Sequence, residues 1–293
     1  MIETSVKENG FQGCFYESGS ESNLALIVLT GSDGRLDYAS QIAERFSENG
    51  IPSIAIAYFN TSETLKDLSE IPVEIIEHAI SWLNGKGFIK TAIYGISKGA
   101  EYALLSASLI KQINAVIAVS ASCCVFEGLT AKKRPAAVSS WSWRGKALPF
   151  ISFSNYTPHF FINFLKDREI RFIDEYDRLL DTEMNESNTI KVENINGPIL
   201  LISAHEDVMW PSERMGNLIM DRLKSKNFEF PYRHEVYQYA SHVLCPIYSP
   251  VRKIFRMERK YRKECDISRN EAFKLSLDLL HKVSISIDME AKV

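Results

Sequence analysis

The stretch Ala92-Ile93-Tyr94-Gly95-Ile96-Ser97-Lys98-Gly99-Ala100-Glu101-Tyr102 decides the fold of this chain. It begins as a short apolar strand, passes through the pattern Gly-x-Ser-x-Gly and continues as an Ala- and Leu-rich helix. A serine on such a tight strand-to-helix turn has a strained backbone and projects its hydroxyl outward. Side chains at the two flanking glycines would collide where strand and helix close on the turn. The order of elements therefore predicts that Ser97 is a nucleophile at the end of a buried strand.

Strands and helices alternate on both sides of this turn. Strands are predicted at residues 24–29, 53–58, 91–94, 115–120, 198–203 and 234–239, most of them as continuous aliphatic runs. Helical spacing of apolar residues predicts helices at residues 38–49, 72–83, 100–110, 212–226 and 267–283. Such alternation implies right-handed crossovers and a mostly parallel sheet with helices on both faces. The predicted class is therefore an α/β fold.

The alternation is interrupted between residues 121 and 196. This segment is rich in aromatic residues from Trp141 to Phe164 and carries a charged helical stretch at residues 167–181. We interpret it as a lid or cap inserted into a single domain that spans residues 1–293. The aromatic residues then form either core beneath the lid or the wall of an acyl pocket.

The composition excludes several classes of partner. With 45% hydrophobic and 24% charged residues, the chain has an ordinary globular composition and ample length for a large core. A formal net charge of −3 indicates no nucleic-acid partner, and no apolar run reaches the ~18 residues of a membrane span. Five cysteines without CxxC spacing indicate a reducing compartment and no metal site. Because no signal peptide is visible at Met1, we expect a cytoplasmic protein.

A serine hydroxyl needs a base, and the base needs an orienting acid. In α/β-hydrolases these residues follow the order serine, acid, histidine, each after a strand. The loop after the predicted strand at 198–203 offers two carboxylates, of which we favour Asp207 over Glu206 as the acid. The loop after the next strand contains His242 behind small residues, which predicts His242 as the base.

Two backbone N–H groups are needed to stabilise the negative oxygen of the reaction intermediate. One is expected from Lys98, the residue after the nucleophile, and the other from Ser32 or Asp33 in the glycine-containing loop at residues 31–34. The alternative is that this loop is a plain turn. We expect the side chain of Lys98 to lie in solvent and Glu101 to do no more than complement the helix dipole. The chemistry requires no metal and no organic cofactor.

Together these motifs resemble the C-terminal catalytic domain of a family of type I acyl-coenzyme A thioester hydrolases and bile-acid-coenzyme A:amino acid N-acyltransferases. The resemblance runs through residues 24–250 and rests, in order, on residues 29–34, 55–60, 94–101, 140–149, 197–202, 207–210 and 239–242. It implies an α/β-hydrolase fold of the dienelactone hydrolase type. It also implies a triad of Ser97, Asp207 and His242 that transfers an acyl group through an acyl-serine.

The resemblance implies a small-molecule acyl thioester or ester as substrate, with hydrolysis favoured because the nucleophile is serine. Transfer of the acyl group to an amine is the alternative, and a non-catalytic binding protein is the alternative from another class. Animal members of the family carry a β-sandwich before the catalytic domain, which we do not expect here because only residues 1–23 precede the first predicted strand. A basic stretch at residues 252–263 is either a solvated helix face or a contact for coenzyme A phosphates.

Overall fold

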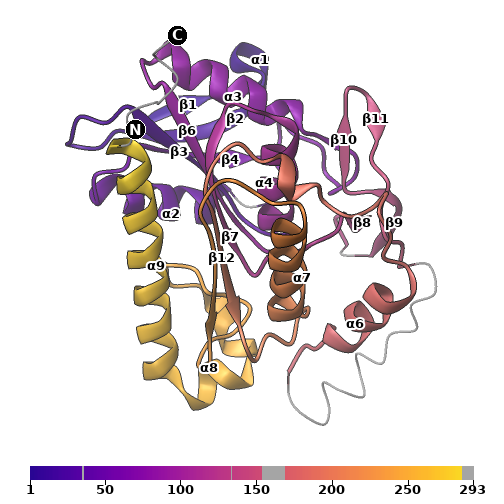
Figure 1. Cartoon of the computed structure of the whole chain (residues 1–293). Helices are drawn as coiled ribbons and strands as arrows, with labels where there is room; N and C mark the ends of the chain where they lie inside the picture. The colour runs from indigo at the N-terminus through magenta and orange to yellow at the C-terminus, as the bar shows by residue number, and fades with distance from the viewer. Residues whose placement is uncertain (35, 133, 154–168, 286–293) are drawn as a thin grey trace.

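The computed structural model describes residues 1–285 apart from 35, 133 and 154–168 (Figure 1). Its centre is an eight-stranded sheet of order β1-β2-β4-β3-β6-β7-β12-β13. The six strands from β4 to β13 pair in parallel, whereas β1 and β2 pair antiparallel at one edge. The strands are β1 (Ile2–Thr4), β2 (Gln12–Tyr16), β3 (Leu24–Leu29), β4 (Ser53–Ala57), β6 (Lys90–Ile96), β7 (Ile113–Val119), β12 (Ile199–Ala204) and β13 (Tyr232–Tyr237).

Helices cover both faces of this sheet because successive side chains of its inner strands point to opposite sides. In β3, Ile27 and Leu29 join one core cluster, and Leu26 and Val28 join the other. The first cluster packs against α3 (Glu74–Gly85), α4 (Lys98–Leu109) and α7 (Ser212–Ser225). The second packs against α2 (Leu36–Glu48) and α9 (Arg262–Ile285), which lie on the other side of the sheet (Figure 1). The predicted α/β fold with a mostly parallel sheet is therefore confirmed.

The N-terminal edge of the sheet was not predicted. A short helix, α1 (Val6–Asn9), separates β1 from β2, and the hairpin they form pairs onto β4. β1 has only three residues, and β2 contains Gly13 near its start, a residue type depleted in strands. Neither strand shows the aliphatic run that marks the parallel strands.

The chain between β7 and β12 forms small sheets and helices beside the main sheet (Figure 1). β8 (Glu127–Leu129) pairs with β9 (Pro135–Ser139), and β10 (Trp141–Trp143) pairs with β11 (Lys146–Ala147) and with β5 (Ile71–Pro72). The described residues of this part also form the helix α6 (Ile173–Thr182) and the 3₁₀ turn η1 (Val192–Asn194). A lid over residues 121–196 stays a prediction, and its aromatic residues Tyr156, Phe160, Phe161 and Phe164 fall outside the described residues.

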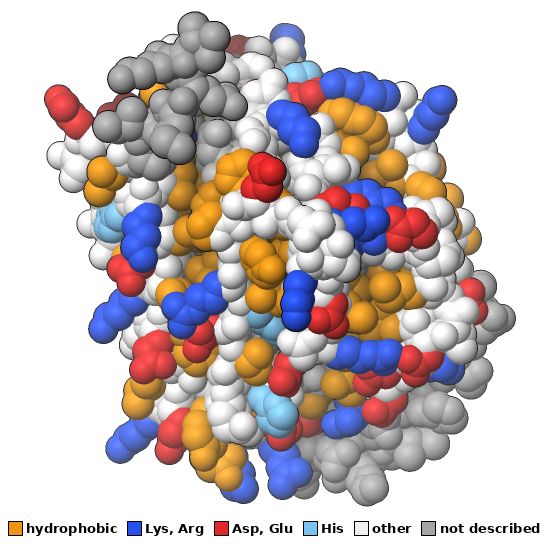
Figure 2. All heavy atoms as spheres, viewed as in Figure 1, with side chains coloured by type: hydrophobic (Ala, Val, Ile, Leu, Met, Phe, Trp, Pro, Cys, Tyr) orange, Lys and Arg blue, Asp and Glu red, His pale blue; other side chains and the backbone are white. Residues whose placement is uncertain are grey.

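The basic stretch at residues 252–263 forms the 3₁₀ turn η2 (Pro250–Ile254), α8 (Arg256–Lys260) and the start of α9. Most of its cations are exposed, as a solvated helix face requires. Arg252 departs from that prediction, because its side chain is buried against acidic partners. Elsewhere on the viewed face, Lys and Arg side chains are interspersed with Asp and Glu (Figure 2). None of the described helices combines the length and the apolar character of a membrane span.

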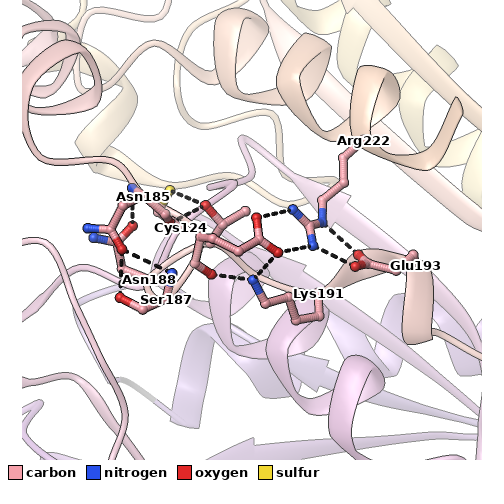
Figure 3. A network of polar contacts seen from close by, with 9 residues as sticks. Cys124, Asn185, Ser187, Asn188, Lys191, Glu193 and Arg222 are labelled. Carbon is pink, nitrogen blue, oxygen red and sulfur yellow. Dashed lines mark hydrogen bonds and ion pairs between the residues drawn. The ribbon is translucent and has the colours of Figure 1, made fainter. Parts of the chain in front are cut away.

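The end of the segment before β12 is held to α7 by one arginine (Figure 3). The guanidinium of Arg222 lies between the carboxylates of Glu186 and Glu193, with N–O distances of 2.7 and 2.5 Å. Lys191 adds a second cation 2.6 Å from Glu186. These hydrogen bonds, with Arg222 the largest contributor, lower the pKa of Glu186 from its ordinary 4.5 to about 2. The network attaches an irregular segment to a regular helix.

Replacing Arg222 should therefore loosen this attachment. We expect Arg222→Gln to lower the free energy of unfolding by about 1–2 kcal/mol, between the values typical of exposed and buried ion pairs. Because the folded-state pKa of Glu186 is depressed, the part of the stabilisation that depends on its carboxylate is present above pH 4.5 and is lost as the pH falls toward 2. Urea denaturation of the wild type and the variant at several pH values measures both effects.

Arg233→Gln is the matched control, because Arg233 pairs with Glu235 on an exposed edge. It should cost less than about 1 kcal/mol. Equal losses for the two variants would contradict the assigned role of Arg222.

Candidate active site

Ser97 occupies a strained turn between β6 and α4. Its backbone lies at φ 57° and ψ −124°, a region that residues other than glycine rarely adopt. A Cβ added to Gly95 would lie 2.1 Å from the carbonyl oxygen of Gly99, and one added to Gly99 would lie 2.2 Å from that of Thr30. Both distances are far below van der Waals contact, so only glycine fits at either position. The Gly-x-Ser-x-Gly pattern is thus required by the close approach of α4 to the ends of β3 and β6.

The structure brings Ser97, His242 and Asp207 together, as the sequence predicted. Ser97 Oγ lies 2.8 Å from His242 Nε2, and His242 Nδ1 lies 2.8 Å from Asp207 Oδ2. These three residues follow β6, β13 and β12, whose carboxyl ends meet at one edge of the sheet. The side chains of His242 and Asp207 are buried. Glu206, the alternative acid, is exposed.

The loop after β12 fixes the orientation of the acid. Asp207 Oδ1 accepts hydrogen bonds from the backbone N–H groups of Met209 and Trp210, at 3.0 and 3.4 Å. Trp210 packs edge-on against the His242 ring at 5.5 Å, and its indole N–H donates to the carbonyl of Ser120. In such an arrangement the imidazole can accept the serine proton while the carboxylate holds the ring in place.

A pocket of about 440 Å³ opens beside the Ser97 hydroxyl. Its wall is mostly apolar and includes Phe153, Tyr176 and Trp210, whose rings meet edge to face at Tyr176. Phe153 comes from the aromatic segment that the sequence offered as a pocket wall, whereas Trp141 of the same segment is fully buried core. The described aromatic residues thus divide between core and pocket wall, and an acyl group as the occupant of the pocket stays a prediction. Among the described residues, no group of three or more His, Cys, Asp and Glu is arranged to hold a metal ion.

Of the three residues predicted to supply oxyanion N–H groups, two line this pocket. Lys98 and Ser32 line it, while Asp33 is not among the described residues of its wall. Lys98 opens α4, where backbone N–H groups have no partner inside the helix. The loop that carries Ser32 passes close to the nucleophile, since a Cβ on Gly31 would lie 3.1 Å from Ser97 Cβ. The oxyanion role of these N–H groups stays a prediction.

A buried tyrosine fixes the position of that loop. The hydroxyl of Tyr58 donates toward the carbonyl oxygens of Thr30 and Gly31, at 2.6 and 2.8 Å. Burial, with a smaller contribution from the nearby charge of Asp33, raises the pKa of Tyr58 well above its ordinary value. The phenol therefore keeps its proton and remains a donor to the loop beside Ser97.

The prediction for the Lys98 and Glu101 side chains is wrong. Both are buried, and Lys98 Nζ lies 3.0 Å from Glu101 Oε1. Burial lowers the pKa of the Lys98 ammonium and raises the pKa of the Glu101 carboxyl, and their mutual attraction opposes both shifts. Lys98, expected in solvent, and Glu101, expected only to complement the helix dipole, instead form one buried ion pair beneath the turn of Ser97.

This ion pair joins the helix after Ser97 to the segment that follows β7. Lys98 Nζ donates to Ser140 Oγ at 2.8 Å, and Glu101 Oε1 accepts from the indole N–H of Trp141 at 2.7 Å and the backbone N–H of Phe126 at 3.1 Å. The i, i+3 spacing alone did not reveal these contacts. They join residues far apart in the sequence, and no local pattern in either segment marks them.

Comparison with known protein families gives a direct match. The family model described as the BAAT / acyl-CoA thioester hydrolase C-terminal domain matches residues 71–263. Acyl-coenzyme A thioesterase 1 of Rattus norvegicus is 25% identical over 230 residues, which are 77% of this chain and 50% of that protein. Acyl-coenzyme A amino acid N-acyltransferase 2 of Mus musculus is 24% identical over 71% of this chain and 46% of its own length. The chain thus spans about half the length of the curated relatives it matches.

Solved structures agree on the fold. An alpha/beta hydrolase from a Medee basin deep-sea metagenome library superposes with a TM-score of 0.59 at 16% identity, covering 96% of each chain. A dienelactone hydrolase-like phosphotriesterase from metagenomic libraries gives a TM-score of 0.51 at 12% identity, over 93% of this chain and 92% of that one. The chain therefore has the α/β-hydrolase fold predicted from the order of its motifs.

The buried ion pair predicts an unequal response to two substitutions. Lys98→Met leaves the Glu101 carboxylate buried without its cation, which should lower the free energy of unfolding by about 3–5 kcal/mol. Adding Glu101→Gln removes that charge but keeps an acceptor for Trp141 and Phe126, so the double variant should recover part of the loss. Thermal and urea denaturation measure both values.

Lys224→Met, at an exposed position of α7, is the control and should leave stability nearly unchanged. A Lys98→Met variant as stable as the wild type would exclude a structural role for the pair.

Proposed function

The chain belongs to the BAAT / acyl-CoA thioester hydrolase C-terminal family, and from this premise we propose that it is a serine hydrolase that cleaves acyl thioesters through an acyl-serine. The observation that carries the proposal is the continuous contact from Ser97 Oγ through His242 to Asp207 at the edge of the pocket. A serine hydroxyl surrounded in this way can lose its proton as it attacks a carbonyl carbon. Binding alone would not require such an arrangement.

In the proposed reaction, Ser97 Oγ bonds to the thioester carbonyl carbon while His242 Nε2 takes its proton. The backbone N–H of Lys98 and one from the loop of Ser32 stabilise the oxyanion, and each such donor contributes about 10²–10³ in rate. The thiolate leaves with the proton from His242. A water molecule, deprotonated by His242, then attacks the acyl-serine, and collapse of the second intermediate releases the acid and restores the Ser97 hydroxyl. Asp207 holds the imidazole in one orientation through both halves.

The pocket supports an apolar acyl group as the part of the substrate next to Ser97. Among the described residues of its wall, Lys98 is the one lysine or arginine, and its ammonium is already paired with Glu101. The leaving group that the relatives suggest is coenzyme A, since the rat relative is an acyl-coenzyme A thioesterase. We therefore propose an acyl-coenzyme A thioester or a similar ester as substrate.

Transfer to an amine is the second candidate. It is supported by the similarity to the mouse acyl-coenzyme A amino acid N-acyltransferase. The same acyl-serine would form, and an amine would replace water in the second half of the reaction. The two functions differ only in the acceptor, so the product distinguishes them.

Hydrolysis of a panel of acyl-coenzyme A thioesters of different chain length tests the proposal. We expect release of free thiol by the wild type and a loss of kcat/KM of about 10³-fold or more in Ser97→Ala, because the covalent step is removed. Ser225→Ala, at an exposed position of α7, should retain wild-type rates. Addition of glycine or taurine should leave free acid as the main product.

Two results would contradict these expectations. Thiol release that persists unchanged in Ser97→Ala would exclude the acyl-serine. Amide as the main product would replace the hydrolase with the acyltransferase.

A further inference from the structure

Behind the loop that carries His242 lies a cluster of two arginines and two acids, which the proposed reaction does not use; all but Asp266 are buried. Arg252 of η2 and Arg269 of α9 face Glu258 of α8 and Asp266 of α9. Arg269 Nη1 lies 2.7 Å from Glu258 Oε1, and Arg252 Nη1 lies 3.3 Å from Asp266 Oδ1. The charges balance within the cluster. Glu258 is 5% exposed and Arg269 is 4% exposed, so water screens their contact very little.

Glu258 also contacts the chain on both sides of His242 through one hydroxyl. Ser241 Oγ donates to Glu258 Oε1 at 2.8 Å and accepts from the backbone N–H of Val243 at 3.3 Å. Ser120, the residue after β7, adds a further hydrogen bond: its Oγ donates to the backbone carbonyl of His242 at 2.9 Å. The residues immediately before and after His242 are thus fixed to one buried carboxylate.

The loop needs such an anchor because it has no regular structure of its own. Residues 238–249 form neither helix nor strand in the described chain, and His242 lies five residues beyond the end of β13. A general base must keep its geometry closely, since a displacement of about 1 Å can cost about 10²-fold in rate. α9 is a rigid support, because Ala272 and Phe273 pack it into the core of the sheet. Arg269 lies on this helix, one turn before them.

We propose that Glu258 is a positioning residue for His242, acting through Ser241 and held in place by Arg269 of α9. The proposal rests on the proposed function, in which His242 is the general base. It also gives the basic stretch at residues 252–263 a role beyond that of a solvated face. Its buried members, Arg252 and Glu258, fix the loop of the base, while its exposed cations remain in solvent.

Two variants test the contact at its two ends. Ser241→Ala removes only the hydroxyl that donates the hydrogen bond. Glu258→Gln removes the negative charge of the group that accepts it. We expect each variant to lower kcat for thioester hydrolysis about 10- to 100-fold with little change in KM. The assay is run well below the unfolding temperature of the variant. Because both act on one contact, the double variant should be no slower than the slower single variant.

Ser268→Ala is the matched control. Ser268 is a buried serine on α9 that bonds only to the backbone of its own helix in the described structure, through Glu264. It should lower the unfolding temperature without lowering kcat. Ser241→Ala keeps the test decisive if Glu258→Gln fails to fold, because it leaves the charge balance of the cluster intact.

A spectroscopic signature separates positioning from general stability. The proton shared by His242 Nδ1 and Asp207 should give a downfield ¹H NMR resonance in the wild type and in Ser268→Ala, and it should broaden or disappear in Ser241→Ala. Unchanged kcat and an unchanged resonance in a folded Ser241→Ala variant would overturn the proposal. A wild type that hydrolyses no thioester would overturn the proposed function instead, and the resonance would still show whether Ser241 and Glu258 hold the His242 ring.

Discussion

The rest of the site depends on a steric constraint, the close approach of α4 to the carboxyl ends of β3 and β6. Glycine at positions 95 and 99 allows main-chain atoms to come within distances that any side chain would forbid. That approach forces Ser97 into a positive φ and turns its hydroxyl away from the core. It also brings the loop after β3 alongside the serine. One packing contact therefore sets the direction of the hydroxyl and the position of the neighbouring N–H groups.

The parallel sheet positions the partners of Ser97, which are His242 and Asp207. Charged side chains on helices hold the segments that lie outside the sheet. Residues beyond the strand ends have no ladder of backbone hydrogen bonds to fix them. The pair Lys98–Glu101 holds the segment after β7, Arg222 holds the segment before β12, and Glu258 holds the loop after β13. In each case a charged side chain on a helix hydrogen-bonds to a segment outside that helix. Removing one partner of the buried pairs Lys98–Glu101 or Glu258–Arg269 is costly, so these two contacts favour a single arrangement of their segments.

The sequence could predict those features that depend on local pattern. Aliphatic runs marked the parallel strands, and the two glycines around Ser97 marked the turn, because both are consequences of local geometry. Asp207 and His242 were found because each follows a strand, and parallel strands gather their carboxyl ends at one edge. The role of these residues in catalysis stays a proposal, while their contact is a feature of the structure.

The features that escaped prediction depend on partners far away in the sequence. Lys98 looks solvated in a helical pattern, and only the distant Ser140 and Trp141 make its burial possible. Glu258 interrupts a basic run and gives no sign that it faces Ser241 and Arg269. Long charged side chains are placed by tertiary contacts, which the local sequence does not encode.

The central claim is that the strained turn makes Ser97 the reactive nucleophile. Reaction of the folded protein with a fluorophosphonate, followed by peptide mass spectrometry, tests it most directly. The account predicts one adduct, located on Ser97, that is absent in Ser97→Ala and forms much more slowly in His242→Ala. An adduct on another residue, or no adduct on the folded wild type, would contradict it.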